Sequence, residues 1–217
     1  MNFLLKPLFL TTLLCLTNNA SSSDQITPVS SNTFASKSGA HLVLNAGLTY
    51  GGDTIYTVFY TNGDMAKIKG GGLYQVGVGG LYQFENQPFA IKLGTHFHYD
   101  LISGSNGGVY FYRFPIETLA YYTGIEKFRI GSGVRVVNSP EISITINSMK
   151  DTVTFENTTG MVAELGYQVA PRAWLNGRMV FEKYQGKSFT TGGVATSLAG
   201  TAAKSGSHIG VNFSYEL

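Results

Sequence analysis

The chain ends in an unbroken alternation of apolar and polar residues over positions 207–217. Successive side chains of a β-strand point to opposite faces, so a period of two predicts a strand with one apolar and one polar face. The apolar face holds Ile209, Val211, Phe213, Tyr215 and Leu217, and the polar face holds His208, Gly210, Asn212, Ser214 and Glu216. Such a strand suits a membrane, where lipid covers one side and a polar lumen lies on the other.

Seven further segments alternate in the same way: 41–50, 73–84, 89–101, 109–122, 128–137, 160–169 and 173–184. The links after the second, fourth and sixth segments are short, and those after the first, third, fifth and seventh are longer. An even number of strands, with short periplasmic turns and long outer loops, is typical of single-chain bacterial outer-membrane barrels. The pattern therefore predicts an all-β fold, an eight-stranded antiparallel up-and-down transmembrane β-barrel over residues 39–217.

Two places depart from the simple pattern. Pro115 falls inside the fourth segment, and because proline cannot donate to the ladder we expect a bulge or a local break there. In the first long link, residues 54–61 and 65–69 flank Asn62-Gly63, a strong turn signal, so we expect a hairpin at the outer rim. A ten-stranded barrel that uses both pieces is the alternative. We interpret the polar links 139–159 and 185–206 as long loops.

Composition agrees with a membrane barrel. The 217 residues include 27 Gly, 14 Phe and 13 Tyr, and only 13% are charged. A soluble β-sandwich, which would hide its apolar faces in a core, is the alternative fold. The net charge of +2 is too small to indicate nucleic acid as a partner.

Aromatic residues gather near the ends of the predicted strands, where their amphipathic rings suit the two membrane interfaces. The expected periplasmic girdle comprises Tyr82, Phe84, Phe89, Tyr121, Tyr122, Phe128, Trp174 and Tyr215, and the expected outer girdle comprises Tyr50, Tyr74, Tyr99, Tyr110 and Tyr184.

The beginning of the chain has the layout of an export signal. Residues 1–20 combine one lysine, an apolar run at 7–16 and small residues before a cleavage point, which predicts a secretory signal peptide and an outer-membrane location. Residues 21–38 are rich in Ser, Thr and Asn, and we interpret them as a flexible leader. Cys15 is the only cysteine. It raises the alternative of a lipoprotein, although Leu14 stands where a lipid-attachment site has a small residue.

The polar faces of the predicted strands carry five cations and five carboxylates. An eight-stranded barrel is just wide enough for side chains to fill it, so these charges are expected to pair and plug the lumen. The predicted network comprises Lys92, His96, His98, Asp100, Arg113, Glu117, Arg129, Arg135, Glu164, Arg178, Glu182 and Glu216. A narrow porin-like path for ions or small solutes through the same network is the alternative.

Few residues point to catalysis. His96, His98 and Asp100 share one face and could ligate a metal, but we interpret them as members of the charge network. The chain has no Gly-x-Ser-x-Gly element, so we expect no enzyme, cofactor or resident metal. A lipid-modifying outer-membrane enzyme is the less favoured alternative. The long loops suit either solvated connections or contact with a surface ligand.

The strand number, the loop asymmetry and the final strand resemble the outer membrane protein A-like group of small Gram-negative barrels. The chain also resembles a poorly characterised set of proteobacterial barrels through Gly51-Gly52-Asp53-Thr54, Tyr60-Thr61-Asn62-Gly63 and Ile68-Lys69-Gly70-Gly71-Gly72. This second resemblance implies no known activity. The first implies contact with outer-membrane lipid and lipopolysaccharide, and assembly machinery that reads the final strand. Phe213, Tyr215 and Leu217 would form that signal, and Leu217 departs from the usual terminal aromatic residue.

Overall fold

The computed structural model describes residues 37–60, 62–105 and 107–217. The expected signal peptide, and all of the expected leader before residue 37, lie outside the described residues. No helix in the described part of the chain is long and apolar enough to span a membrane.

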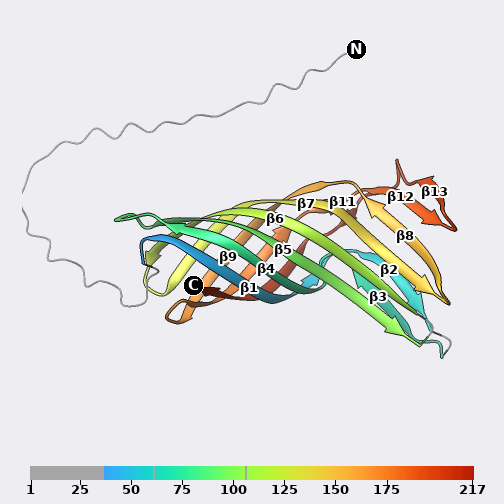
Figure 1. Cartoon of the computed structure of the whole chain (residues 1–217), viewed down its shortest axis with the longest axis horizontal. Coiled ribbons are helices and arrows are strands. Elements are labelled where there is room, and N and C mark those ends of the chain that lie inside the picture. The colour runs from blue at the N-terminus through green and yellow to red at the C-terminus, as the bar shows by residue number, and fades with distance from the viewer. Residues whose placement is uncertain (1–36, 61, 106) are drawn as a thin grey trace, which may run out of the picture. The chain divides into compact units, whose positions relative to one another are not determined.

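Eight antiparallel strands pair in a closed ring (Figure 1). In order around the ring they are β1 (Gly39–Gly51), β4 (Leu73–Gln83), β5 (Phe89–Gly104), β6 (Gly107–Ile125), β7 (Phe128–Ile146), β9 (Thr158–Ala170), β10 (Ala173–Phe181) and β15 (His208–Glu216). The last strand closes the ring against the first, from Glu216 opposite Val43 to His208 opposite Gly51. The ring follows chain order, which confirms the predicted up-and-down barrel of eight strands.

The other strands lie beyond the ring, toward the end of the barrel away from the C-terminus in Figure 1. The strands β2 (Thr54–Phe59) and β3 (Met65–Lys69) form a separate hairpin, so the ten-stranded alternative is wrong. The sheet continues from β7 into β8 (Met149–Phe155), β12 (Gly186–Thr191) and β13 (Val194–Ser197). A short pair joins β11 (Lys183–Tyr184) to β14 (Lys204–Ser205).

The interpretation of residues 139–159 and 185–206 as loops is wrong in large part. Strand β7 continues nine residues past the predicted end at Val137 and turns into β8. The alternation persists there in a weaker form, because Ile142 and Ile144 face a buried cluster whereas Ser143 and Thr145 fall on the other face of the strand. The polar residues of this stretch occupy the second face of a sheet that extends outside the barrel.

The ladder is interrupted next to Pro115, as expected. The pairs between β5 and β6 stop at Thr95 opposite Ile116 and resume at His98 opposite Arg113. On the other side of β6 the register with β7 shifts between Tyr112 and Phe114. The proline therefore lies next to a bulge, which bends β6 and β7 where they extend beyond the ring.

The outer face of the ring is apolar on every strand. Exposed aliphatic and aromatic residues alternate with buried ones along β1, at Leu42, Leu44 and Leu48, and along β15, at Val211 and Phe213. A continuous belt of this kind is far larger than the apolar patches of water-soluble proteins, and it matches the lipid-facing surface of a membrane barrel. The soluble sandwich is therefore wrong, and the fold is a transmembrane β-barrel.

Most of the predicted girdle residues lie on this outer face, but three do not. The side chains of Tyr121, Trp174 and Tyr184 are buried. Tyr121 and Trp174 have the inward parity of their strands, since Trp174 alternates in step with the buried Asn176 on β10. Tyr184 lies past the end of β10 and packs into the buried cluster above the lumen.

Candidate functional site

The interior of the ring is the candidate functional site, because nearly all the buried charged side chains of the described residues lie there. The structure places all twelve predicted network residues inside, with Asp100 the most exposed at 8%. Their formal charges balance, since five Lys and Arg side chains accompany five Asp and Glu side chains. Buried ions are tolerated when they are paired and hydrogen-bonded, so the partners of each charge decide what the lumen can do.

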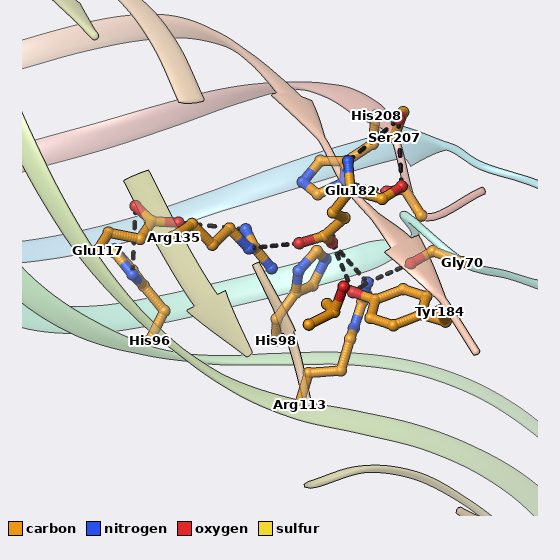
Figure 2. Close-up of polar contacts among 12 residues, drawn as sticks. Gly70, His96, His98, Arg113, Glu117, Arg135, Glu182, Tyr184, Ser207 and His208 are labelled. Carbon is orange, nitrogen blue, oxygen red and sulfur yellow. Dashed lines mark hydrogen bonds and ion pairs between the residues drawn. The ribbon is translucent and has the colours of Figure 1, made fainter. Parts of the chain in front are cut away.

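Glu117 on β6 lies at the middle of the network. Its two carboxylate oxygens each accept a hydrogen bond of 2.7 Å from Arg178 Nη2 on β10, across the lumen. Arg135 Nη1 on β7 donates to the same carboxylate at 3.1 Å, and His96 Nδ1 on β5 lies 3.7 Å away (Figure 2). Arg135 is the cross-strand neighbour of Glu117, whereas Arg178 reaches it from β10, so one carboxylate links two parts of the barrel wall.

A second group of contacts fills the half of the lumen near the short turns. Arg129 donates to Glu216 at 3.0 Å and to Asn176 Oδ1 at 2.8 and 3.2 Å. Glu164 accepts the Tyr121 hydroxyl at 2.7 Å, and its Oε1 lies 3.9 Å from both Lys92 Nζ and Arg129 Nη2. These contacts connect β5, β6, β7, β9, β10 and β15.

A third group surrounds Glu182 in the half near the long links (Figure 2). Its carboxylate lies 2.8 Å from Arg135 Nε and accepts the Tyr184 hydroxyl at 2.5 Å. His208 Nδ1 lies 3.9 Å from the same carboxylate, and its ring packs edge-on against His98 at 5.2 Å. His98 Nε2 is hydrogen-bonded to Thr49 Oγ1 at 2.8 Å.

The link between β3 and β4 is drawn into this mouth of the barrel. Arg113 donates from Nη1 to the Gly70 carbonyl and from Nη2 to the Gly72 carbonyl, the latter at 2.5 Å. Asp100 accepts the backbone N–H of Lys69 at 3.2 Å. A Cβ on Gly71 would lie 2.3 Å from His208 Cβ, so the link can approach His208 this closely only because residue 71 is a glycine.

Asp53 joins three segments: its own motif at 51–54, the glycine motif at 68–72 and the last long link, which contains Ser205. Its backbone N–H donates to the Ser205 carbonyl, and its Oδ2 accepts the Ser205 N–H, both at 2.8 Å. Its own carbonyl accepts the Gly70 N–H at 2.9 Å. The sequence shows the motif but not this role. The pairing of an aspartate with two glycine-rich stretches is the only signal that could have indicated it.

An apolar cluster lies beyond the charges, at the end of the barrel near the long links. Its buried members are Ile68, Val109, Phe111, Val137, Ile142, Ile144, Phe155 and Tyr184. They come from the hairpin β2–β3, from the walls β6 and β7, and from β8 and β11. The Arg113 guanidinium lies 4.5 Å from the centre of the Phe111 ring, so the charged layer and the apolar layer are in direct contact.

The histidines do not form a metal centre with other ligands. Among the described residues, no group of three or more His, Cys, Asp or Glu side chains could hold a metal ion. His96 and His98 lie in different groups of the network, near Glu117 and Thr49 respectively. His41 is half-buried near the start of β1, and its ring nitrogen contacts the backbone carbonyl of Lys37.

The three residues expected to form an assembly signal lie together at the C-terminal end. The side chains of Phe213, Tyr215 and Leu217 are exposed on the outer face, and the Leu217 N–H donates to the Leu42 carbonyl at 2.8 Å. They are therefore accessible from the lipid side of the seam between β15 and β1.

The closed ring, the apolar exterior and the charged interior define the class of protein: a small, eight-stranded transmembrane β-barrel. No family model matches the chain, and none of the curated proteins matches its sequence. Among solved structures, the crystal structure of Neisserial surface protein A (NspA) is similar to it. The TM-score is 0.48 and the sequence identity 10%, and the match covers 83% of this chain and 98% of that chain.

Proposed function

We propose that this chain is a Gram-negative outer-membrane barrel with a lumen closed to ions and solutes, which acts through its extracellular surface. The short turns would face the periplasm and the long links the outside, as this asymmetry is oriented in bacterial barrels. The observation that carries the proposal is the charge-balanced interior, covered by the glycine link and the apolar cluster.

The pairing inside the lumen supports a closed resting state. A continuous water path would have to separate Glu117 on β6 from Arg178 on β10, which binds it across the lumen. Breaking a buried ion pair costs about 3–5 kcal/mol, because it leaves a charge without its partner. Opening would also have to pull the β3–β4 link off Arg113. Thermal fluctuations therefore populate an open lumen only rarely.

The outer ends of the strands support a role in surface contact. The sheet extends past the ring through β7, β8, β12 and β13, so the outer links are ordered strands that a rigid barrel presents. Two hairpin tips carry exposed apolar pairs, Phe59 with Met65 and Ile146 with Met149, and Phe59 is 74% exposed. Exposed apolar groups clustered on polar supports are typical of binding surfaces.

Lipopolysaccharide and outer-membrane lipid are the proposed surroundings of the barrel, and a surface ligand the proposed partner of the tips. The exposed seam residues Phe213, Tyr215 and Leu217 are the proposed signal for barrel-assembly machinery. No feature of the site calls for a cofactor.

The test replaces the four tip residues Phe59, Met65, Ile146 and Met149 with serine. Cells that produce the wild type should adhere to epithelial monolayers or aggregate with one another more than vector controls, and the variant should fall to the control level. A matched variant with Val194 replaced by serine, at the separate β12–β13 tip, should keep the wild-type behaviour. Heat-modifiable gel migration verifies folding. Equal adhesion and aggregation for wild type and vector would contradict the surface role.

A further inference from the structure

A lysine and a tyrosine meet at the outer edge of the apolar belt, where β1 leads into the hairpin β2–β3 (Figure 1). Tyr50 is the last member of the row that also holds Leu44 and Leu48 on the outer face of β1, and it is 65% exposed. The Lys69 ammonium, from β3, lies 4.2 Å from the centre of the Tyr50 ring. Neither the lumen network nor the proposed function uses this pair.

The neighbouring tyrosines indicate that this pair lies at the level of a membrane interface. Tyr74 on β4 is opposite Leu48 on β1, and Tyr99 on β5 is opposite Tyr74, with the two ring centres 5.4 Å apart. Tyrosine side chains gather where a barrel leaves the hydrocarbon layer and meets the lipid headgroups. The Lys69 ammonium therefore lies at the height of the headgroups that surround the barrel.

The two side chains together present hydrogen-bond donors to the outside. Lys69 Nζ donates to the Tyr50 hydroxyl oxygen at 2.9 Å, and neither group has another hydrogen-bond partner in the described part of the chain. An ammonium group has three N–H donors and no acceptor, so the Tyr50 hydroxyl keeps its own proton to donate. The backbone of Lys69 is fixed, because its N–H donates to Asp100 and the residue pairs with Thr54 in the hairpin. The pair thus offers several donors and a positive charge in a fixed place.

A second lysine adds to this charge, and no carboxylate neutralises it. Lys67 lies two residues before Lys69 on the same face of β3, because the buried Ile68 between them faces the apolar cluster. Among the described residues, neither ammonium group lies within 4.0 Å of a carboxylate oxygen. The rim of the barrel therefore carries two unpaired positive charges next to the membrane surface.

We propose that Lys69 and Tyr50, with Lys67 beside them, bind the phosphate group of a lipid in the surrounding membrane leaflet. A phosphate group offers oxygen acceptors and negative charge, so it can accept from the ammonium and from the hydroxyl at once. The acyl chains of the same lipid would lie against the apolar row that includes Leu44 and Leu48. The inference rests on the proposed function in one respect: with the long links outside, the lipid is the phosphorylated glycolipid of the outer leaflet, lipopolysaccharide.

Native mass spectrometry of the folded barrel in an uncharged detergent tests the inference, with lipid A as the probe. Titration with lipid A should give a saturable adduct of one lipid per barrel. Lys69→Met keeps the length of the side chain and should weaken this binding about fivefold, as expected for one basic residue near an anionic surface. Combined with Lys67→Met, it should weaken binding about 25-fold, to the level of lipid A from which the phosphates have been removed.

Two further variants separate the hydroxyl from the charge. Tyr50→Phe keeps the ring and loses the hydroxyl, so it should weaken the binding of lipid A about two- to tenfold, as expected for one lost hydrogen bond. The matched control Lys150→Met removes an exposed lysine from β8, outside the ring, and should leave the affinity unchanged. Heat-modifiable migration of every sample shows that the barrel is folded. The exposed positions Tyr50 and Lys67 keep the inference testable if Lys69→Met does not fold.

Equal binding of lipid A and its dephosphorylated form would overturn the inference, and so would wild-type affinity in the double lysine variant. Excess inorganic phosphate should not displace the lipid, and displacement would overturn the choice of a lipid headgroup over a free ion. Because the titration needs neither cells nor the four tip residues, its failure leaves the proposed surface role standing. Loss of that role with intact binding of lipid A would leave the phosphate site standing.

Discussion

Removing the charge of Glu117 should destabilise the barrel more than removing any exposed carboxylate. The substitution Glu117→Gln keeps the size of the side chain and one acceptor oxygen. It takes the negative charge away from Arg178, which contacts both carboxylate oxygens at 2.7 Å. Arg135 is less affected, because Glu182 remains 2.8 Å from its Nε. The structure thus identifies Arg178 as the cation left without its counter-ion.

The size of the effect follows from the burial of this pair. Arg178 and Glu117 are both almost completely inaccessible to water. Loss of one partner from a buried ion pair typically costs about 3–5 kcal/mol, and the remaining amide oxygen places the expected loss near 3 kcal/mol. Replacing both partners with apolar residues of similar volume is often nearly neutral, so Glu117→Leu combined with Arg178→Met should recover much of the loss.

The assay is urea unfolding of the barrel in lipid vesicles, with the folded fraction read from heat-modifiable gel migration. The matched control is Glu85→Gln, which removes the same charge from an exposed turn and should leave the midpoint unchanged. If Glu117→Gln also leaves the midpoint unchanged, the charge network does not stabilise the fold and the reasoning is refuted. A double variant less stable than the single one would equally count against it.

Three further outcomes follow from the packing. Gly77→Val should lower the free energy of unfolding by about 1–3 kcal/mol in the same assay, because a Cβ there would lie 2.2 Å from the His96 ring. The control Gly80→Val has open space around its Cβ and should be tolerated. Equal effects of the two substitutions would contradict the assigned faces of β4. Val211→Arg on the lipid-facing belt should lower the free energy of unfolding by about 2–4 kcal/mol if the residue lies near the bilayer midplane. The control Val194→Arg, outside the ring, should have little effect. If neither substitution changes the stability, the outer face is not a lipid-facing belt. Arg113→Ala should speed amide hydrogen exchange in the link between β3 and β4, since the two carbonyl contacts of the guanidinium are lost, and unchanged exchange would show that the link is held by other means.

The membrane-facing part of the fold could be predicted from the sequence because lipid enforces strict parity. In a strand with lipid on one face and the lumen on the other, lipid-facing and lumen-facing residues alternate. An apolar residue that faces lipid therefore indicates that the next side chain faces the lumen. That rule predicted the eight strands of the ring, and it placed Glu117 and Arg178 on the inner face. It did not predict which cation meets which anion, because that depends on the stagger between strands.

The rule fails where lipid no longer constrains the strands. Beyond Val137 both faces of β7 meet protein or water, so Ser143 and Thr145 are as acceptable as apolar residues and the strand resembles a polar loop. The girdle prediction for Trp174 disregarded this parity, because Trp174 alternates in step with the inward-facing Asn176 and Arg178 on β10. The inward path of the β3–β4 link depends on contacts to backbone carbonyls, and side-chain patterns carry no record of these.

Most of the account depends on whether the lumen is closed, and single-channel recording tests this most directly. Refolded wild-type protein, shown by heat-modifiable migration to be folded, is inserted into a planar lipid bilayer in high salt. The account predicts a current indistinguishable from that of the empty bilayer, because paired charges fill the interior and the β3–β4 link covers its mouth. Reproducible unitary openings would contradict it and would favour a narrow channel through the same network.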